Sequence, residues 1–140
     1  KVSPKVDRPH KSVLIVDDIP TNQLIIEEII TSIGLKPITS CNGKQAFEAF
    51  IQHHKDGSAF KVIIMDCEMP IMDGFESTEM IREYEKSHGL KPALIIALSA
   101  HAEQEYRLRS KQSGMDIYLT KPVQTATLIQ HIENQYRSLA

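Results

Sequence analysis

The sequence predicts an α/β fold in which helices cover both faces of a five-stranded parallel sheet, a doubly wound arrangement. Five short apolar runs recur along the 140 residues, and a segment of helical character follows each of them. Alternation of this kind is typical of βα units whose strands lie parallel. The length fits a single domain that is large enough to bury a substantial core.

The five apolar runs are of strand length, and most of them are rich in isoleucine and valine, which favours strands over helices. They span residues 12–16, 35–40, 61–65, 93–98 and 115–119. Five parallel strands joined by single crossover helices predict the flavodoxin-like (βα)5 fold, with strand order 2-1-3-4-5.

Helical spacing of apolar residues defines the segments between the strands. Pro20 suits the first turn of the first helix, Gly34 suits its end, and Asn42 suits the N-cap of the second helix. The segment 102–112 is polar almost all round, so this fourth helix is expected to pack loosely. The apolar stripes of the other helices fall within residues 25–33, 46–51, 75–81 and 128–136.

Composition and charge exclude several classes of protein. The net charge of −2 has no basic bias, so direct nucleic-acid binding is not expected. No apolar run reaches the length of a membrane span, so no membrane contact is expected either. Cys41 and Cys67 have neither CxxC nor metal-type spacing, which indicates free thiols in a reducing, cytoplasmic compartment.

The chain divides into a tail and one domain. Residues 1–10 are polar, carry two prolines and have no periodicity, so they are interpreted as a linker or tail. Residues 11–140 are the predicted domain. Because the chain does not begin with Met, it is expected to be a piece of a longer protein.

Four of the five predicted strands are followed by polar residues. Asp17 and Asp18 follow the first strand, Asp66 the third, Ser99 the fourth, and Lys121 lies just beyond the fifth. Ligands of open α/β sheets bind at the carboxyl ends of the strands, near the point where the strand order reverses. The first and third strands are neighbours there, so the three aspartates are expected to lie together.

Three carboxylates in one crevice require a neutralising charge, because like charges repel and are costly to bury. No histidine or cysteine cluster is available, and oxygen ligands favour Mg²⁺. Lys121 and Ser99 offer a cation and a hydroxyl donor for a phosphate group. A carboxylate in such a site can act as a nucleophile towards a phosphoryl group.

Four stretches of the chain resemble the receiver domain of two-component response regulators. The resemblance covers nearly the whole chain from Lys11 onward and matches the family in order and spacing. Its pieces are VLIVDDIPTN (13–22), IIMDCEMPIMDGFE (63–76), IIALSAHA (95–102) and YLTKP (118–122). The motifs DDIPTNQ, MDCEMP and ALSAHA are more similar to those in receivers of hybrid histidine kinases than to those in receivers of transcription factors.

The resemblance implies a Mg²⁺-dependent phosphoacceptor site. Asp66 would become an aspartyl phosphate. Asp18 and Asp66 would bind Mg²⁺ directly and Asp17 partly through water, while the backbone carbonyl of Glu68 would add a further ligand.

The same resemblance implies how the signal is passed on. Ser99 would hydrogen-bond the phosphoryl group and Lys121 would pair with it, with a cis bond between Lys121 and Pro122. Tyr118 occupies the position of the switch aromatic, which turns inward when Ser99 is drawn towards the phosphate. His101, two residues beyond Ser99, is either a residue that tunes hydrolysis of the phosphate or a solvated loop residue.

The implied function is that of a phosphorelay receiver. The domain would catalyse its own phosphorylation and dephosphorylation as part of a hybrid histidine kinase, although this chain contains no kinase domain. That kinase would be cytoplasmic, or membrane-bound with this domain in its cytoplasmic part. The donor would be a histidine kinase or a histidine-containing phosphotransfer protein, and the receiver would be a monomer or weak dimer. The expected docking contacts are Ile19, Pro20, Gln23 and Pro122.

Two other functions compete with this one. A receiver that binds partners without being phosphorylated usually lacks one of the site residues, and this chain lacks none. A flavodoxin-like cofactor binder is disfavoured because the first βα loop, DDIPTN, is acidic and has no glycine to approach a phosphate. Two further residue assignments are structural: Asp73 caps a turn beside Gly74, and His53 and His54 lie on an exposed helix end.

Overall fold

The computed structural model of the chain describes residues 11–139. Its five strands are all parallel and form one sheet in the order β2-β1-β3-β4-β5, which confirms the predicted fold class and strand order. The predicted strands differ from the observed ones by two residues or fewer at either end. The strands are β1 (Ser12–Val16), β2 (Lys36–Ser40), β3 (Val62–Asp66), β4 (Leu94–Ser99) and β5 (Ile117–Thr120).

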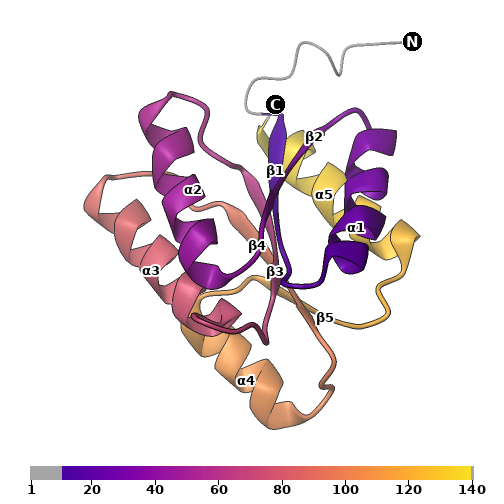
Figure 1. Ribbon diagram of the computed structural model, residues 1–140. Helices are drawn as coiled ribbons and strands as arrows, with labels where there is room; N and C mark the ends of the chain where they lie inside the picture. The colour runs from indigo at the N-terminus through magenta and orange to yellow at the C-terminus, as the bar shows by residue number, and fades with distance from the viewer. Residues whose placement is uncertain (1–10, 140) are drawn as a thin grey trace.

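Five helices enclose the sheet, with α1 and α5 on one side and α2, α3 and α4 on the other (Figure 1). Alternate residues of β1 explain this layering. Leu14 and Val16 belong to the apolar cluster that includes α2 and α3, whereas Val13 and Ile15 belong to the cluster with α1 and α5. The helices are α1 (Pro20–Ser32), α2 (Gly43–Lys55), α3 (Gly74–Ser87), α4 (Gln104–Ser113) and α5 (Thr125–Leu139).

The helix ends follow the predicted signals. Pro20 opens α1, and Gly34, with φ of +83°, follows its end. The Asn42 side chain accepts the Gln45 N–H at 2.9 Å and so caps α2 as predicted. Asp73 accepts the Glu76 N–H in the same way, which makes it the N-cap of α3. Among residues 11–139, no helix is long and apolar enough to cross a membrane.

The assignment of His53 and His54 to a helix end is confirmed, but the expected exposure of these residues was wrong. Both lie in the last turn of α2, but both are half buried. The His53 ring stacks on Phe60 with 4.2 Å between ring centroids, and His54 Nδ1 lies 2.8 Å from the Tyr84 hydroxyl. The polar character of the histidines suggested exposure, whereas Phe60, just before β3, and Tyr84 of α3 pack against them.

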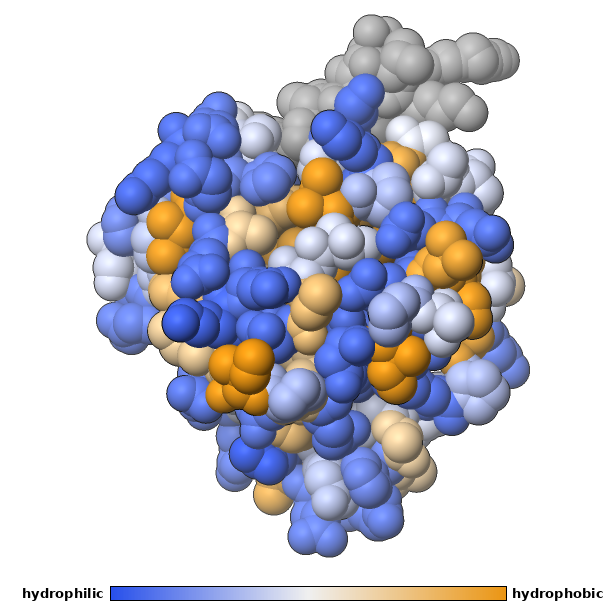
Figure 2. Space-filling model, in the orientation of Figure 1, coloured by the Kyte–Doolittle hydropathy of each residue, from blue (hydrophilic) through white to orange (hydrophobic). Residues whose placement is uncertain are grey.

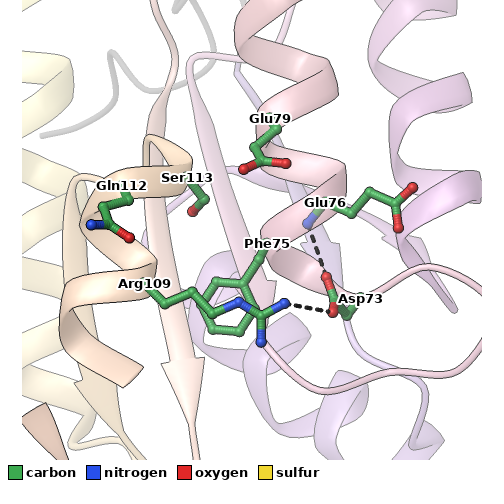
Figure 3. A pocket seen from close by; sticks show the side chains of 7 residues that line it. All are labelled: Asp73, Phe75, Glu76, Glu79, Arg109, Gln112 and Ser113. Atoms are coloured by element: carbon green, nitrogen blue, oxygen red, sulfur yellow. Dashed lines mark hydrogen bonds and ion pairs between the residues drawn. The ribbon is translucent and has the colours of Figure 1, made fainter. Parts of the chain in front are cut away.

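Helix α4 is attached loosely, as its polar sequence predicted. It buries only Ser110 and Ser113. Figure 3 shows how Arg109 reaches across from α4 to the start of α3. Its guanidinium lies 4.3 Å from the centre of the Phe75 ring and 3.5 Å from the Asp73 carboxylate. Side chains at the rim of the groove between the two helices therefore hold α4 in place.

Arg82 ties α3 to the beginnings of β4 and β5, at the end of the sheet opposite the aspartates. Its Nε donates to the Gly114 carbonyl at 2.9 Å, and its Nη1 to the Ala93 carbonyl at 2.9 Å. The same guanidinium pairs with Glu85 at 2.9 Å and with Asp116 at 2.8 Å. The carboxylate of Glu85 is buried and also accepts the Ala93 N–H at 2.7 Å. We call this network the Arg82 clamp.

Candidate functional site

Three aspartates meet at the carboxyl ends of β1 and β3, as the strand order predicts. One oxygen from each of Asp17, Asp18 and Asp66 lies within 4.8 Å of the others. Asp17 and Asp66 are 4% and 3% exposed, whereas Asp18 is exposed. The apolar residues that precede these aspartates build β1 and β3, two neighbouring inner strands of the sheet, so the core itself carries the carboxylates to this edge.

Asp17 is held through each of its polar groups. Its N–H donates to the Ser40 carbonyl at 3.1 Å, and its Oδ1 accepts the Ile19 N–H at 2.9 Å. Its Oδ2 lies 3.6 Å from Lys121 Nζ, and its carbonyl oxygen accepts the side-chain amide of Gln23 at 2.6 Å. These contacts fix both the backbone and the carboxylate at the end of β1.

The carboxyl group of Asp66 has an unusually high pKa, about 6. Burial is the main cause, because removing the carboxylate from water disfavours its charged form. The Lys121 ammonium, 3.1 Å from Asp66 Oδ1, lowers this pKa, while the negative charges of Asp17 and Glu68 raise it. The attraction of Lys121 therefore offsets only part of the cost of ionising Asp66.

The charges at this site are unbalanced in a way that suits a divalent cation. Within residues 11–139, Lys121 is the only basic side chain that forms ion pairs with these aspartates. Hard carboxylate oxygens are the ligands that Mg²⁺ prefers in proteins, commonly one or two carboxylates together with water. The residues present therefore fit Mg²⁺, and a bound cation would relieve the repulsion among the three carboxylates.

Ser99 and Tyr118 are connected through the loop that follows β4. The buried Ser99 hydroxyl donates to the Glu68 carboxylate, with both oxygens at 3.3 Å, and accepts the His101 N–H at 3.1 Å. The half-buried Tyr118 donates its hydroxyl to the His101 carbonyl at 2.6 Å. The Arg107 guanidinium lies 5.0 Å from the centre of the Tyr118 ring. A movement of Ser99 would thus displace His101, and through it Tyr118.

Two glycines allow the loops around Asp66 to pack closely. A Cβ atom at Gly74 would overlap the carbonyl oxygen of Asp66, and one at Gly43 would lie 2.6 Å from the Met72 carbonyl oxygen. Ile71, between these loops, is 79% exposed and has a φ of +71°, which is unfavourable for a β-branched residue.

The bond between Lys121 and Pro122 is cis, as the resemblance implied.

The expected docking residues differ in their surroundings. Ile19, Pro20 and Pro122 are exposed, whereas Gln23 is half buried and directs its amide inward. Apolar side chains gather over α1 on the face seen in Figure 2, and Leu24 and Ile25 are 56% and 57% exposed. Sequence reasoning placed Ile25 within the apolar stripe and did not single out Leu24. The sequence did contain a signal for exposed apolar side chains on α1, because this helix has more apolar residues than one buried face can hold.

Fold and site together define a doubly wound α/β domain with an acidic cluster and a lysine at the reversal point of the strand order. The sequence profile described as the response regulator receiver domain matches residues 13–133. The chain belongs to this family.

Known proteins of three organisms illustrate the similarity. The chain is 41% identical over 118 residues to the sensor histidine kinase GacS of Pseudomonas protegens, covering 84% of this chain and 12% of that kinase. The receiver domain of the Arabidopsis thaliana kinase CKI1, solved with Mg²⁺ and BeF3⁻, has a TM-score of 0.77 and 34% identity. That comparison covers 93% of this chain and 94% of the solved one.

A third similar structure is the Saccharomyces cerevisiae complex of the phosphotransfer protein Ypd1 with the receiver domain of Ssk1. Its TM-score is 0.82 with 30% identity, covering 92% of this chain and 90% of the solved one. The chain spans only about an eighth of the GacS kinase, so the similarity concerns a receiver and not the rest of that protein.

Proposed function

We propose that this domain is a phosphorelay receiver that accepts a phosphoryl group from a phosphohistidine onto Asp66. The observation that carries the proposal is the placement of a buried Asp66 between Lys121 and two further aspartates. The similar CKI1 receiver was solved with Mg²⁺ and with BeF3⁻. The buried carboxylate is the nucleophile, and the polar groups around it accommodate the charge of a phosphoryl group.

In the transfer step, a carboxylate oxygen of Asp66 forms a bond to phosphorus as the P–N bond to the donor histidine breaks. The imidazole leaves with the electron pair of that bond and takes up a proton from solvent. Lys121 Nζ, 3.1 Å from Asp66 Oδ1, is placed to pair with the phosphoryl oxygens. Later attack of water on the phosphorus restores the carboxylate and releases inorganic phosphate.

Asp17, Asp18, Asp66 and the backbone carbonyl of Glu68 would hold Mg²⁺. When bound, the ion reduces the repulsion between carboxylate and phosphoryl oxygens and stabilises charge on the group being transferred. Asp17 is already fixed by its contacts with Ile19 and Lys121, whereas Asp18 is exposed and accessible to an incoming ion.

The donor is proposed to be a histidine-containing phosphotransfer protein or the dimerisation domain of a histidine kinase. The Ssk1 receiver forms a complex with such a phosphotransfer protein, Ypd1. The exposed Ile19, Pro20 and Pro122 border the site and are suited to an apolar contact with the donor. We further propose a cytoplasmic setting within a hybrid histidine kinase, in keeping with the free Cys41 and Cys67.

Treatment with acetyl phosphate tests the chemistry directly. With Mg²⁺ present, mass spectrometry is expected to show the gain of one phosphoryl group, because Asp66 then has the neutralising charge that the reaction needs. Omitting Mg²⁺ or introducing Asp66→Asn should abolish the gain. An equal gain in the Asp66→Asn protein would place the phosphoryl group elsewhere and refute the proposal.

Phosphorylation is expected to move Ser99 and Tyr118. The Ser99 hydroxyl would exchange its 3.3 Å contacts with Glu68 for a phosphoryl oxygen, which disturbs the His101 loop and its bond to Tyr118. Amide NMR shifts before and after phosphorylation measure this. We expect the largest changes outside the site within residues 99–120, and unchanged shifts there would contradict the switch role of Tyr118.

A further inference from the structure

The side-chain amide of Gln23 points into the molecule, where β1 and β2 end. Gln23 lies in the first turn of α1 and is half buried. Its Nε2 group donates to the Asp17 carbonyl at 2.6 Å and to the Ser40 carbonyl at 3.3 Å. One amide thus joins a helix to the ends of two neighbouring strands. These bonds occupy the group that would otherwise contact a docking partner.

The carbonyl of Asp17 belongs to the peptide unit that links Asp17 to Asp18. Fixing this peptide sets the direction in which both acidic side chains leave the backbone. Without a cation, repulsion among the carboxylates favours their separation, and this repulsion is strong where water is partly excluded. The bond from Gln23 to the Asp17 carbonyl opposes this separation of the carboxylates, because it holds the backbone at Asp17.

We propose that Gln23 is a positioning residue for the Mg²⁺ site and not a docking contact. Its amide holds the Asp17–Asp18 peptide against α1 and β2, so the carboxylates are already arranged when the ion arrives. The inference rests on the proposed function in one respect, namely that the aspartate cluster binds Mg²⁺. Groups that orient metal ligands in this way typically change metal affinity by about 10- to 100-fold when they are removed.

The decisive variant is Gln23→Met, which keeps the length of the side chain and removes its N–H donors. Gln45→Met is the matched control. Gln45 is exposed, and its Oε1 accepts at 2.9 Å the N–H of Cys41, the residue that follows the end of β2. Gln23→Met loses two side-chain bonds to the backbone and Gln45→Met loses one, but only Gln23 bonds to the peptide that carries the aspartates.

A Mg²⁺ titration followed by backbone amide NMR shifts measures the dissociation constant without any phosphoryl donor. We expect Gln23→Met to raise the dissociation constant about tenfold and Gln45→Met to change it less than about twofold. Acetyl phosphate labelling of Gln23→Met should recover when Mg²⁺ is raised to saturation, since the nucleophile itself is intact. If Gln23→Met does not fold, Gln23→Ser leaves room for water at the two carbonyls and serves in its place.

An unchanged Mg²⁺ dissociation constant in a folded Gln23 variant would overturn the proposal. An equal loss in Gln45→Met would also overturn it, because the effect would then be general to the loop. The proposed function fails separately: a wild-type protein that binds Mg²⁺ but is not labelled would contradict phosphoryl transfer, and the metal titration would still decide the role of Gln23.

Discussion

Replacing Asp66 with asparagine is expected to stabilise the metal-free protein at pH 7.5 by about 3 kcal/mol. The carboxyl group has a pKa of about 6 in the folded protein, compared with 3.8 for an unperturbed aspartate. The folded state therefore binds this proton more tightly than the unfolded state does. Stability from this group is present below pH 4 and is lost as the pH rises through about 6. An amide does not ionise and avoids this loss.

Urea unfolding of the two proteins across pH 4 to 7.5, without Mg²⁺, measures the effect. The difference between their free energies of unfolding should shrink as the pH falls from about 6 to about 4. Added Mg²⁺ should stabilise the wild type at pH 7.5 more than the Asp66→Asn variant, because the ion compensates the buried charge. Asp56→Asn, at an exposed carboxylate, is the control. A wild type more stable than Asp66→Asn at pH 7.5 without Mg²⁺ would contradict the prediction.

Removing the Arg82 clamp is expected to cause a large loss of stability although it lies outside the site. Arg82→Met leaves the Glu85 carboxylate buried without its ion-pair partner and leaves the Gly114 and Ala93 carbonyls without their donors. Breaking one side of a buried pair typically costs about 3–5 kcal/mol. We therefore expect the free energy of unfolding in urea to fall by about 3 kcal/mol.

Two further variants separate the buried charge from the general loss of a side chain. In the Arg82→Met background, Glu85→Gln removes the unpaired charge and should recover part of the stability. Lys86→Met, at an exposed position on the same helix, should change stability by less than about 0.5 kcal/mol. If Arg82→Met lowers the free energy of unfolding by less than about 1 kcal/mol, water replaces the bonds of the Arg82 guanidinium and the prediction is wrong.

Local patterns in the sequence were sufficient for the fold and for much of the site. Apolar runs ending in Asp17, Asp18 and Asp66 identify strands together with the side chains that they carry to the sheet edge. The strand order then brings the three aspartates together, because parallel strands end at the same edge. Proline at the start of α1 and glycine after its end fixed that helix equally well.

Contacts between segments distant in the chain were not predictable from these patterns. From its sequence position Gln23 resembles an exposed helix residue, and its bond to the Ser40 carbonyl exists only because the end of β2 lies beside α1 in the fold. His54 lies beside Tyr84, 30 residues further along the chain, only because α2 and α3 pack together. The same limit applies to the Arg82 clamp, whose carbonyl acceptors leave no trace in the side-chain pattern of the sequence. Periodicity reports which face of an element is buried, but not what lies against it.

The Arg82 clamp also reaches the residue that follows α4. Gly114, which directly follows α4, is bound to the Arg82 side chain, whereas the other end of the helix begins beside the His101 loop. α4 is thus held to α3 within its second half, through Arg109, and just beyond its end, through Gly114. A small displacement at His101 then becomes a rotation that is largest at the start of the helix. The exposed surface of α4 near that start would therefore change most when the domain is phosphorylated.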